Sequence, residues 1–227
     1  MNDIRSCIYQ VPIFQALPQD SILRLQRAMH HKRIAPGQAV VSAGQAVDHL
    51  IVVSSGRLKL TKVARSGREQ VVRELGPGDF FGEMGLFAPL VAEADLVAVT
   101  ETDACLLRRS AVQAELTSHP EVALALVETL AKRLADAERT IGEIALLDVG
   151  QRLASELLRL SQARKAGHSG PVTIEIPYTW AEMASRLATT PESLSRRLRA
   201  LVDEGVIEVQ GRTVTVRDVE VLWERTF

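Results

Sequence analysis

The sequence is poor in residues that several protein classes require. Only two cysteines, Cys7 and Cys105, occur among its 227 residues. They are too few for a secreted disulfide scaffold or a four-thiolate iron–sulfur cluster. The five histidines show no recognisable metal-ligand spacing, so we expect no metal site and no cofactor. Aromatic residues make up only 4% of the chain, so its cores must consist mostly of Val, Leu, Ile and Ala.

A large net charge and long apolar runs are also lacking. The net charge is −1 with a pI near 6.5, so no global basicity indicates nucleic acid. No apolar run approaches the ~18 residues of a membrane span, and the N-terminus MNDIRSCIYQ does not resemble a signal peptide. We therefore expect a cytoplasmic protein with no membrane contact. Its length suits two modest domains.

A long helix is predicted from His119-Pro120 to Asp148, and it divides the chain. Proline suits a first helical turn. Apolar residues recur along the helix at steps of four and three, the a/d spacing of a two-stranded coiled coil. The alternative is a core helix lying on its own domain, which usually shows a wider apolar face. We expect residues 119–148 to form a dimerisation helix through Ala123, Val127, Leu130, Leu134, Ala137, Ile141 and Ile144.

The region before this helix is predicted to be a β-roll. Residues 1–32 look helical, with Ile22, Leu23, Leu25 and Met29 on one side. Short β-rich runs separated by glycine turns follow, which is typical of a β-sandwich or jelly roll. The fold class is therefore α+β, with a sensor domain over residues 1–118. The expected strands are Ala39–Val41, Leu50–Val53, Leu58–Val63, Gln70–Leu75, Asp79–Phe81, Leu96–Thr100 and Ala104–Arg108.

Residues 149–227 are predicted to form a winged helix-turn-helix. Thr179 and Glu182 make a capping box for a short helix ending near Ala188. Thr190-Pro191 then opens a second helix that runs to about Glu204. The other elements expected here are an amphipathic helix over Gln151–Gln162, a loop over Ala163–Pro171 and a hairpin over Ile207–Val216.

The second short helix carries residues suited to reading DNA. Glu192, Ser195 and Arg196 lie on one face, and a guanidinium can bond guanine O6 and N7 while a carboxylate accepts from cytosine N4. The alternative is an ordinary solvated helix face. Leu194, Leu198, Leu201 and Val202 are expected to pack inward. Auxiliary or phosphate contacts are assigned to Thr179, Thr190, Arg197, Arg199 and Arg212.

The chain resembles the CRP/FNR family of bacterial transcription regulators over nearly its full length. The matching stretches are Gly78–Phe87, Ala131–Leu134 leading to Ala145–Asp148, and Thr179–Gly205. The resemblance implies a cyclic-nucleotide-binding-type β-roll, a dimerising helix and a winged helix-turn-helix. The implied partners are double-stranded DNA, a second copy of the chain and RNA polymerase.

Details of the DNA-reading segment favour one branch of the family. The pattern Glu192-x-x-Ser195-Arg196 resembles FNR-type recognition helices, which implies palindromic TTGA-type half-sites. Many members carry Gly where this chain has Ala188. A left-handed backbone is unfavourable for Ala by about 1 kcal/mol, so we expect a reshaped turn there.

The nucleotide pocket that the resemblance implies is degenerate. Cyclic-AMP-binding members resemble the chain at Gly82-Glu83, but they hold the phosphate with Arg-Ser where Glu93-Ala94 stand here. No Lys or Arg occurs between Arg73 and Arg108. A buried phosphate without a cationic partner is costly, so we expect no cyclic AMP response. Glu83 is then expected to cap turn amides near Gly82 or Gly85.

The signal is left open. The stretch Cys7–Phe14 resembles the FNR-like-protein subgroup, whose redox sensing is attributed to a cysteine pair, so Cys7 with Cys105 is a candidate redox pair. The alternative makes Cys105 a core residue and Cys7 incidental. A bond requires the two Cα atoms to come within roughly 4.4–6.8 Å. A heme or gas, a different nucleotide, or effector-independent action are further alternatives.

The sequence gives less support to other classes of function. A cupin dioxygenase needs clustered His and Glu ligands, whereas His49 is the only histidine in the expected barrel. We therefore expect no enzyme and name no catalytic residue. A scaffolding module with a degenerate helix-turn-helix conflicts with Glu192, Ser195 and Arg196 in register. The leading interpretation is a homodimeric, sequence-specific transcription regulator.

Overall fold

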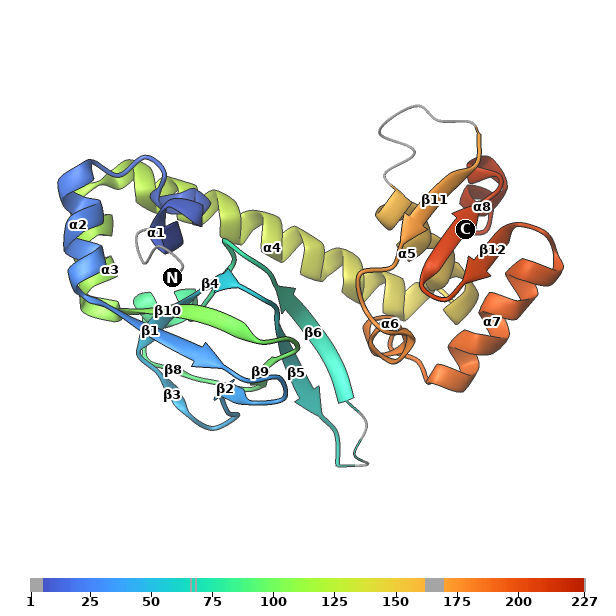
Figure 1. Ribbon diagram of the computed structural model, residues 1–227, viewed down its shortest axis with the longest axis horizontal. Coiled ribbons are helices and arrows are strands. Elements are labelled where there is room, and N and C mark those ends of the chain that lie inside the picture. The colour runs from blue at the N-terminus through green and yellow to red at the C-terminus, as the bar shows by residue number, and fades with distance from the viewer. Residues whose placement is uncertain (1–5, 66, 68, 162–169, 227) are drawn as a thin grey trace. The chain divides into compact units, whose positions relative to one another are not determined.

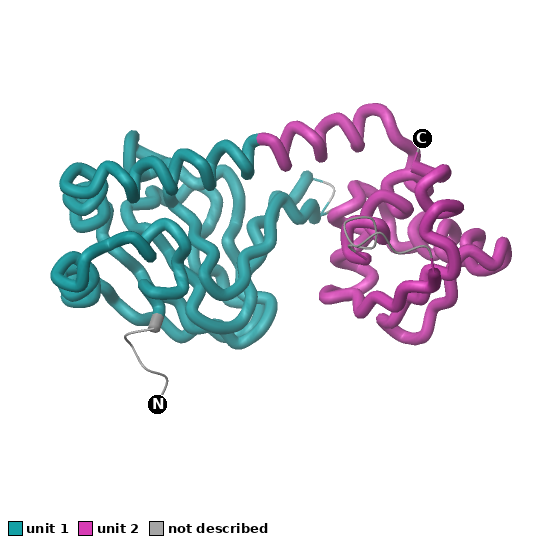
Figure 2. Tube along the Cα trace, turned by 90° about the horizontal axis from the view of Figure 1, so that it is seen from above, with its two compact units in different colours: residues 1–134 teal, residues 135–227 magenta. Residues whose placement is uncertain are grey.

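A computed structural model describes residues 6–65, 67, 69–161 and 170–226 of the chain. The chain divides into two compact units, Met1–Leu134 and Ala135–Phe227 (Figure 2). Each unit has its own hydrophobic core. The long helix α4 (Pro120–Leu146) contributes residues to both.

The N-terminal unit is the expected β-roll of antiparallel strands (Figure 1). A small ladder joins β3 (Ala46–Val47) to β8 (Leu90–Val91). Ile34, Ile51, Leu58, Leu96 and other apolar side chains fill the core of the roll. One sheet has the order β1-β10-β4-β7, which are Met29–Ile34, Thr102–Arg108, His49–Ser55 and Phe80–Phe81. The other has the order β2-β9-β5-β6, which are Ala39–Val41, Asp95–Ala98, Leu58–Val63 and Glu69–Leu75.

Helices form a second core with the outer face of the first sheet. Phe14 and Leu25 from the N-terminal helices meet Leu107 of β10 and Leu126 of α4 in this cluster. Every one of these four side chains is fully buried. The N-terminal helices are α1 (Ser6–Gln10), η1 (Pro12–Phe14) and α2 (Gln19–Arg27), and α3 (Arg109–Ser118) precedes α4.

Two expectations for this unit were wrong. Residues 29–32 are not helical, because Met29 begins β1 and all six residues of that strand pair with β10. The strand is at the sheet's edge and buries only its two end residues, so it shows neither a helical nor an alternating pattern. The helix α3 was also missed, although it buries Val112 and Leu116.

The C-terminal unit has the expected helix, helix-turn-helix and hairpin. The helices are α5 (Val149–Ser161), α6 (Trp180–Arg186) and α7 (Pro191–Asp203), and the hairpin is β12 (Ile207–Gln210) with β13 (Thr213–Val216). Two unexpected elements complete it. Strand β11 (Val172–Glu175) pairs with β13, and α8 (Val219–Glu224) follows the hairpin. Most of the loop expected over 163–171 lies outside the described residues.

Candidate nucleic-acid interface and sensor sites

Both helices of the helix-turn-helix begin at the predicted caps. The Thr179 hydroxyl accepts from the Glu182 amide at 3.2 Å, and the Glu182 carboxylate accepts from the Thr179 amide at 2.7 Å. This reciprocal pair confirms the capping box. The Thr190 hydroxyl accepts from the Ser193 amide at 3.3 Å, with Pro191 in the first turn. Local hydrogen bonds therefore set where each helix starts.

The candidate base-reading residues lie exposed on α7. Glu192, Ser195 and Arg196 are all exposed, as is Arg199 one turn later. Hydrogen bonds from its own amide and from the Thr190 hydroxyl lower the pKa of the Glu192 carboxyl, and the Arg196 charge adds to this. A carboxylate acceptor and a guanidinium donor therefore stand side by side at the helix's N-terminal half.

The opposite face of α7 fixes its orientation in the unit. Leu194 and Leu201 are buried, and Leu198 packs partly against the same core. Val202 was expected to pack inward too, but 40% of it is exposed. Three leucines rather than four apolar residues therefore hold this helix.

The turn between the helices keeps a left-handed residue although Gly is missing. Ala188 has φ of 50°, so the expectation of a reshaped turn was wrong. The amide of Ala188 donates to Ser185 O at 3.0 Å, and that of Thr189 donates to Ala184 O at 2.9 Å. These bonds satisfy the carbonyls at the end of α6 and hold Ala188 in a conformation costing about 1–2 kcal/mol.

Two other basic residues predicted to contact DNA phosphates lie on different elements of the C-terminal unit. Arg197 on α7 reaches Asp148, with Nη2 to Oδ2 at 3.8 Å. Arg212 is exposed at the turn between β12 and β13. The Trp180 indole donates to Gly211 O at 3.0 Å and so ties this wing to α6.

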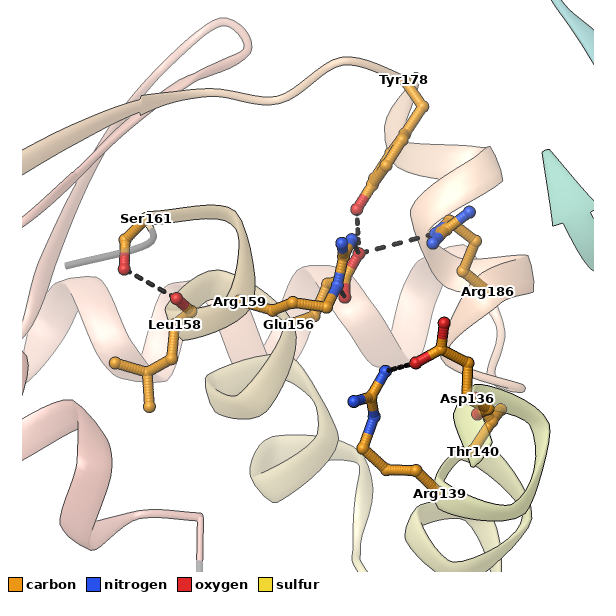
Figure 3. A network of polar contacts seen from close by, with 9 residues as sticks. All are labelled: Asp136, Arg139, Thr140, Glu156, Leu158, Arg159, Ser161, Tyr178 and Arg186. Carbon is orange, nitrogen blue, oxygen red and sulfur yellow. Dashed lines mark hydrogen bonds and ion pairs between the residues drawn. The ribbon is translucent and has the colours of Figure 1, made fainter. Parts of the chain in front are cut away.

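A largely buried carboxylate connects α5 to the helix-turn-helix (Figure 3). Glu156 on α5 accepts from Arg159 at 2.6 and 2.7 Å and from the Tyr178 hydroxyl. Arg186 of α6 lies 3.5 Å from the same carboxylate and over the Tyr178 ring. Burial raises the pKa of the Glu156 carboxyl, but the Arg159 hydrogen bonds and charge outweigh it, so the pKa is lowered overall. The charged carboxylate links α5 to the segment that starts α6.

In the N-terminal unit, the carboxylate of Glu83 is bonded by two arginines of the same chain. Glu83 begins η2 (Glu83–Leu86), and its carboxylate is buried. Its Oε1 accepts from Arg133 of α4 at 2.7 Å and from Arg73 of β6 at 3.2 Å. Both guanidinium groups also donate to Phe80 O, and that of Arg133 lies 4.2 Å from the Phe80 ring centroid.

This geometry corrects the expectation for Glu83. The carboxylate bonds two arginines rather than the turn amides near Gly82 or Gly85, and the Gly85 amide donates to Gly82 O. Burial lowers the pKa of the Arg133 guanidinium, and the charge of Arg73 lowers it further. Neither arginine was assigned to the site, because they come from residues 10 before and 50 after Glu83.

The other two pocket residues do not join this cluster. The Glu93 side chain is 84% exposed and pairs with Lys62 at 3.1 Å. Ala94 is buried. The two positions that were expected to replace Arg-Ser therefore hold a solvated carboxylate and a buried methyl group.

A disulfide joins Cys7 of α1 to Cys105 of β10, with their Cα atoms 6.7 Å apart. Cys7 is 1% exposed and Cys105 is fully buried. Both belong to the cluster between the helices and the first sheet. The bond therefore ties the start of the described chain to a central strand of that sheet.

Known families match both units. The cyclic nucleotide-binding domain matches residues 31–119, and the Crp-like helix-turn-helix domain matches residues 151–225. The probable transcriptional regulator flp of Lacticaseibacillus casei is 30% identical over 215 residues, which are 95% of each chain. The chain belongs to the CRP/FNR family of transcription regulators.

Two further similarities extend the match. The CRP-like cAMP-activated global transcriptional regulator of Mycobacterium tuberculosis is 28% identical over 213 residues, covering 94% of this chain and 95% of its own. The solved structure of FixK2 from Bradyrhizobium japonicum has a TM-score of 0.72 at 22% identity and covers 88% of this chain and 98% of its own. FixK2 shows the CRP/FNR fold.

Membership of the CRP/FNR family settles the class of activity. The chain is a DNA-binding transcription regulator and not an enzyme. No helix among the residues that the structure describes is long and apolar enough to cross a membrane. In those residues no group of three or more His, Cys, Asp or Glu side chains is arranged to hold a metal ion.

CRP/FNR members act as dimers. In the single chain, helix α4 carries an apolar stripe that is partly exposed. In the single chain Val127, Leu134, Ile141 and Ile144 are 43–67% exposed. Ala137 is exposed as well. Two other members of the predicted seam, Ala123 and Leu130, pack partly against the core of their own unit. Leu124, which was not predicted, is 60% exposed beside the seam.

Proposed function

We propose that this regulator reads palindromic TTGA-type half-sites as a homodimer. The observation that carries the proposal is the exposed row of Glu192, Ser195 and Arg196 on the capped N-terminal half of α7. Arg196 would give two hydrogen bonds to a guanine, and Glu192 would accept from cytosine N4. Ser195 has a hydroxyl that can donate or accept at a base edge.

The auxiliary residues position the recognition helix α7 on the DNA backbone. Arg197, Arg199 and the wing's Arg212 are exposed cations, and Thr179 and Thr190 mark helix N-termini, where backbone amides bind phosphate well. Phosphate contacts of this kind fix register without specifying sequence. Arg197 would exchange its long 3.8 Å contact with Asp148 for a phosphate.

The dimer follows from the exposed stripe on α4. Two copies related by a two-fold axis would bury Val127, Leu134, Ala137, Ile141 and Ile144 against each other, with Ala123 and Leu130 at the end of the seam. Two symmetry-related recognition helices match a palindrome whose half-sites lie about one helical turn apart. The bound dimer would act on transcription through RNA polymerase.

The signal we propose is redox state rather than cyclic AMP. The disulfide between Cys7 and Cys105 supports a redox signal, because cytosolic disulfides in mesophiles are usually transient and catalytic or redox-sensing. Against cyclic AMP, Glu83 already accepts from two arginines, and Glu93 stands at the phosphate partner's place. The Mycobacterium tuberculosis relative is named as cAMP-activated, so this chain would differ from it in its signal.

A second candidate is action without any effector. The observation that favours it is the guanidinium of Arg133, which ties α4 to Glu83 and Phe80 O without a ligand. That contact would hold the long helix against the roll permanently.

An operator titration separates these readings. Purified protein is titrated onto DNA selected from a random library, reduced and oxidised, with and without cyclic AMP. The proposal expects a TTGA core, an affinity that depends on oxidation and no effect of cyclic AMP. Equal affinities in all four conditions favour action without an effector. A selected site without a TTGA core contradicts the reading of α7.

A further inference from the structure

A histidine stands directly against the disulfide. His31 of β1 is the cross-strand neighbour of Cys105 in the β1–β10 register. Its Nδ1 lies 3.6 Å from the Cys105 sulfur. A disulfide sulfur carries no hydrogen, so this contact is a hydrogen bond only when Nδ1 is protonated. The Cys105 sulfur therefore accepts a hydrogen bond from His31 whenever the ring carries a proton on Nδ1.

The histidine and the sulfurs differ in their access to water. Cys7 and Cys105 are almost completely buried, whereas His31 is exposed on the sheet's edge strand. The imidazole can therefore exchange protons with water on one side while its Nδ1 contacts a buried sulfur. Histidine is the side chain best suited to this transfer near neutral pH.

The two cysteines lie in elements of different local stability. Cys105 lies in a strand that pairs with β1 on one side and β4 on the other. Cys7 lies in α1, which has only five residues. A short helix opens locally at a lower free energy than a strand inside a sheet. An attacking thiolate therefore reaches Cys7 more easily than Cys105.

We propose that His31 is the proton donor and acceptor for thiol–disulfide exchange at the Cys7–Cys105 bond. This role rests on the redox function proposed above. In reduction, a thiolate attacks the Cys7 sulfur and forms a mixed disulfide with it. Cys105 leaves with the electron pair of the broken S–S bond and takes the proton from His31. His31 regains a proton from water.

A second thiol completes the exchange. It attacks the reductant's sulfur in the mixed disulfide, so Cys7 leaves as a thiolate and is protonated by water. The net change converts two reductant thiols and one protein disulfide into one reductant disulfide and two protein thiols. Oxidation by a small disulfide follows the same steps in reverse, with His31 taking the proton of Cys105.

The charged residues on the same face of the two strands pair with one another. On the same face of β1 and β10, Arg33 pairs with Asp103 at 3.2 Å and lies 4.0 Å from Glu101. Tyr9, on the helix that carries Cys7, is half exposed. His30 is exposed too, but it alternates to the other face and is the cross-strand neighbour of Leu106. His30 is therefore a matched control.

The test measures reduction of the full-length oxidised protein by glutathione. Aliquots are alkylated and the free thiols are counted by mass spectrometry from pH 5.5 to 8.5, with rates expressed per glutathione thiolate. In the wild type this rate should be higher at low pH than at high pH, because the proposed proton donor is a histidine. His31→Gln should lower the rate at low pH about tenfold, a small share of the ~10²–10⁴ that positioned acids contribute in enzymes. His30→Gln should leave the profile unchanged.

Two further arms keep the test independent of folding and of DNA. His31→Arg retains a charge that does not titrate, so it should lose the pH dependence even if stability changes slightly. Peptide mapping should find the trapped glutathione on Cys7. A wild-type profile in His31→Gln, or glutathione on Cys105, overturns the role. The redox function itself fails separately, if oxidised and reduced proteins bind the operator equally.

Discussion

The two units of this regulator treat their charged functional positions in opposite ways. On α7 of the C-terminal unit, Glu192 and Arg196 are exposed and available to a partner. In the N-terminal unit, Glu83 is buried and bonded to Arg73 and Arg133. A carboxylate and guanidinium groups are therefore open to a partner in one unit and bonded to each other in the other. The difference between the two units is whether residues of the same chain already bond the charged side chain.

The largest effect should come from the disulfide, which belongs to the N-terminal unit alone. Reduction should lower the free energy of unfolding of that unit by up to about 4–5 kcal/mol, because the bond closes a loop of nearly a hundred residues. Denaturant titration with and without reductant, followed by hydrogen exchange, would assign the loss to a unit. The double variant Cys7→Ser/Cys105→Ser should not respond to reductant. An equal loss of stability in both units would contradict the expectation that the disulfide stabilises the N-terminal unit alone.

The second effect concerns the α4 stripe. Leu134→Asp or Ile141→Asp should give monomers by sedimentation, because each places an unpaired charge in an apolar seam. Operator affinity should fall on the order of a hundredfold or more, since the two half-sites would no longer be bound together. Ala135→Asp adds the same charge off the stripe and should remain dimeric. A monomeric wild type that binds a palindrome tightly would contradict this prediction.

The third effect sharpens the account of the C-terminal unit. Arg196→Ala should cost about 1–3 kcal/mol of binding and relax selectivity at one guanine. Arg212→Ala should weaken all sequences alike and reduce the salt dependence of binding, because phosphate carries no sequence information. Binding to a set of single-base operator variants at several salt concentrations separates the two. Equal relaxation by both variants would contradict the division of roles.

Local signals were predictable from sequence, whereas the only distant partners that were anticipated were Cys7 and Cys105, on the strength of a family resemblance. The Thr179 capping box and the hairpin Ile207–Val216 lie where expected, because each depends on neighbouring residues. Strand β1 was missed because a charged edge strand carries no apolar alternation. The arginines at Glu83 were missed because residue spacing does not reveal which strand and helix meet.

The fourth effect tests the strained turn between α6 and α7 of the helix-turn-helix. Ala188→Gly should stabilise the C-terminal unit by roughly 0.5–1 kcal/mol, because relief of the left-handed strain exceeds the added freedom of the unfolded chain. Ala200→Gly, within α7, should instead destabilise it by about 1 kcal/mol. Thermal unfolding of the two variants should therefore shift in opposite directions. A loss of stability in both would show that the Ala188 methyl contributes packing that outweighs the strain.

The smallest expected effect is that of cyclic AMP, which should neither raise the melting temperature nor change operator affinity. The Glu93 side chain is exposed. We propose that it stands at the place of the phosphate partner, where a carboxylate would repel the cyclic phosphate. Calorimetry on a ladder of variants separates the two obstacles. Binding by Glu93→Arg/Ala94→Ser would make the missing phosphate partner decisive. Binding only after Arg73→Ser is added would make the occupied Glu83 decisive. Saturable micromolar binding by the wild type would show that both contacts yield to the nucleotide, and the contrast between the two units would then fail.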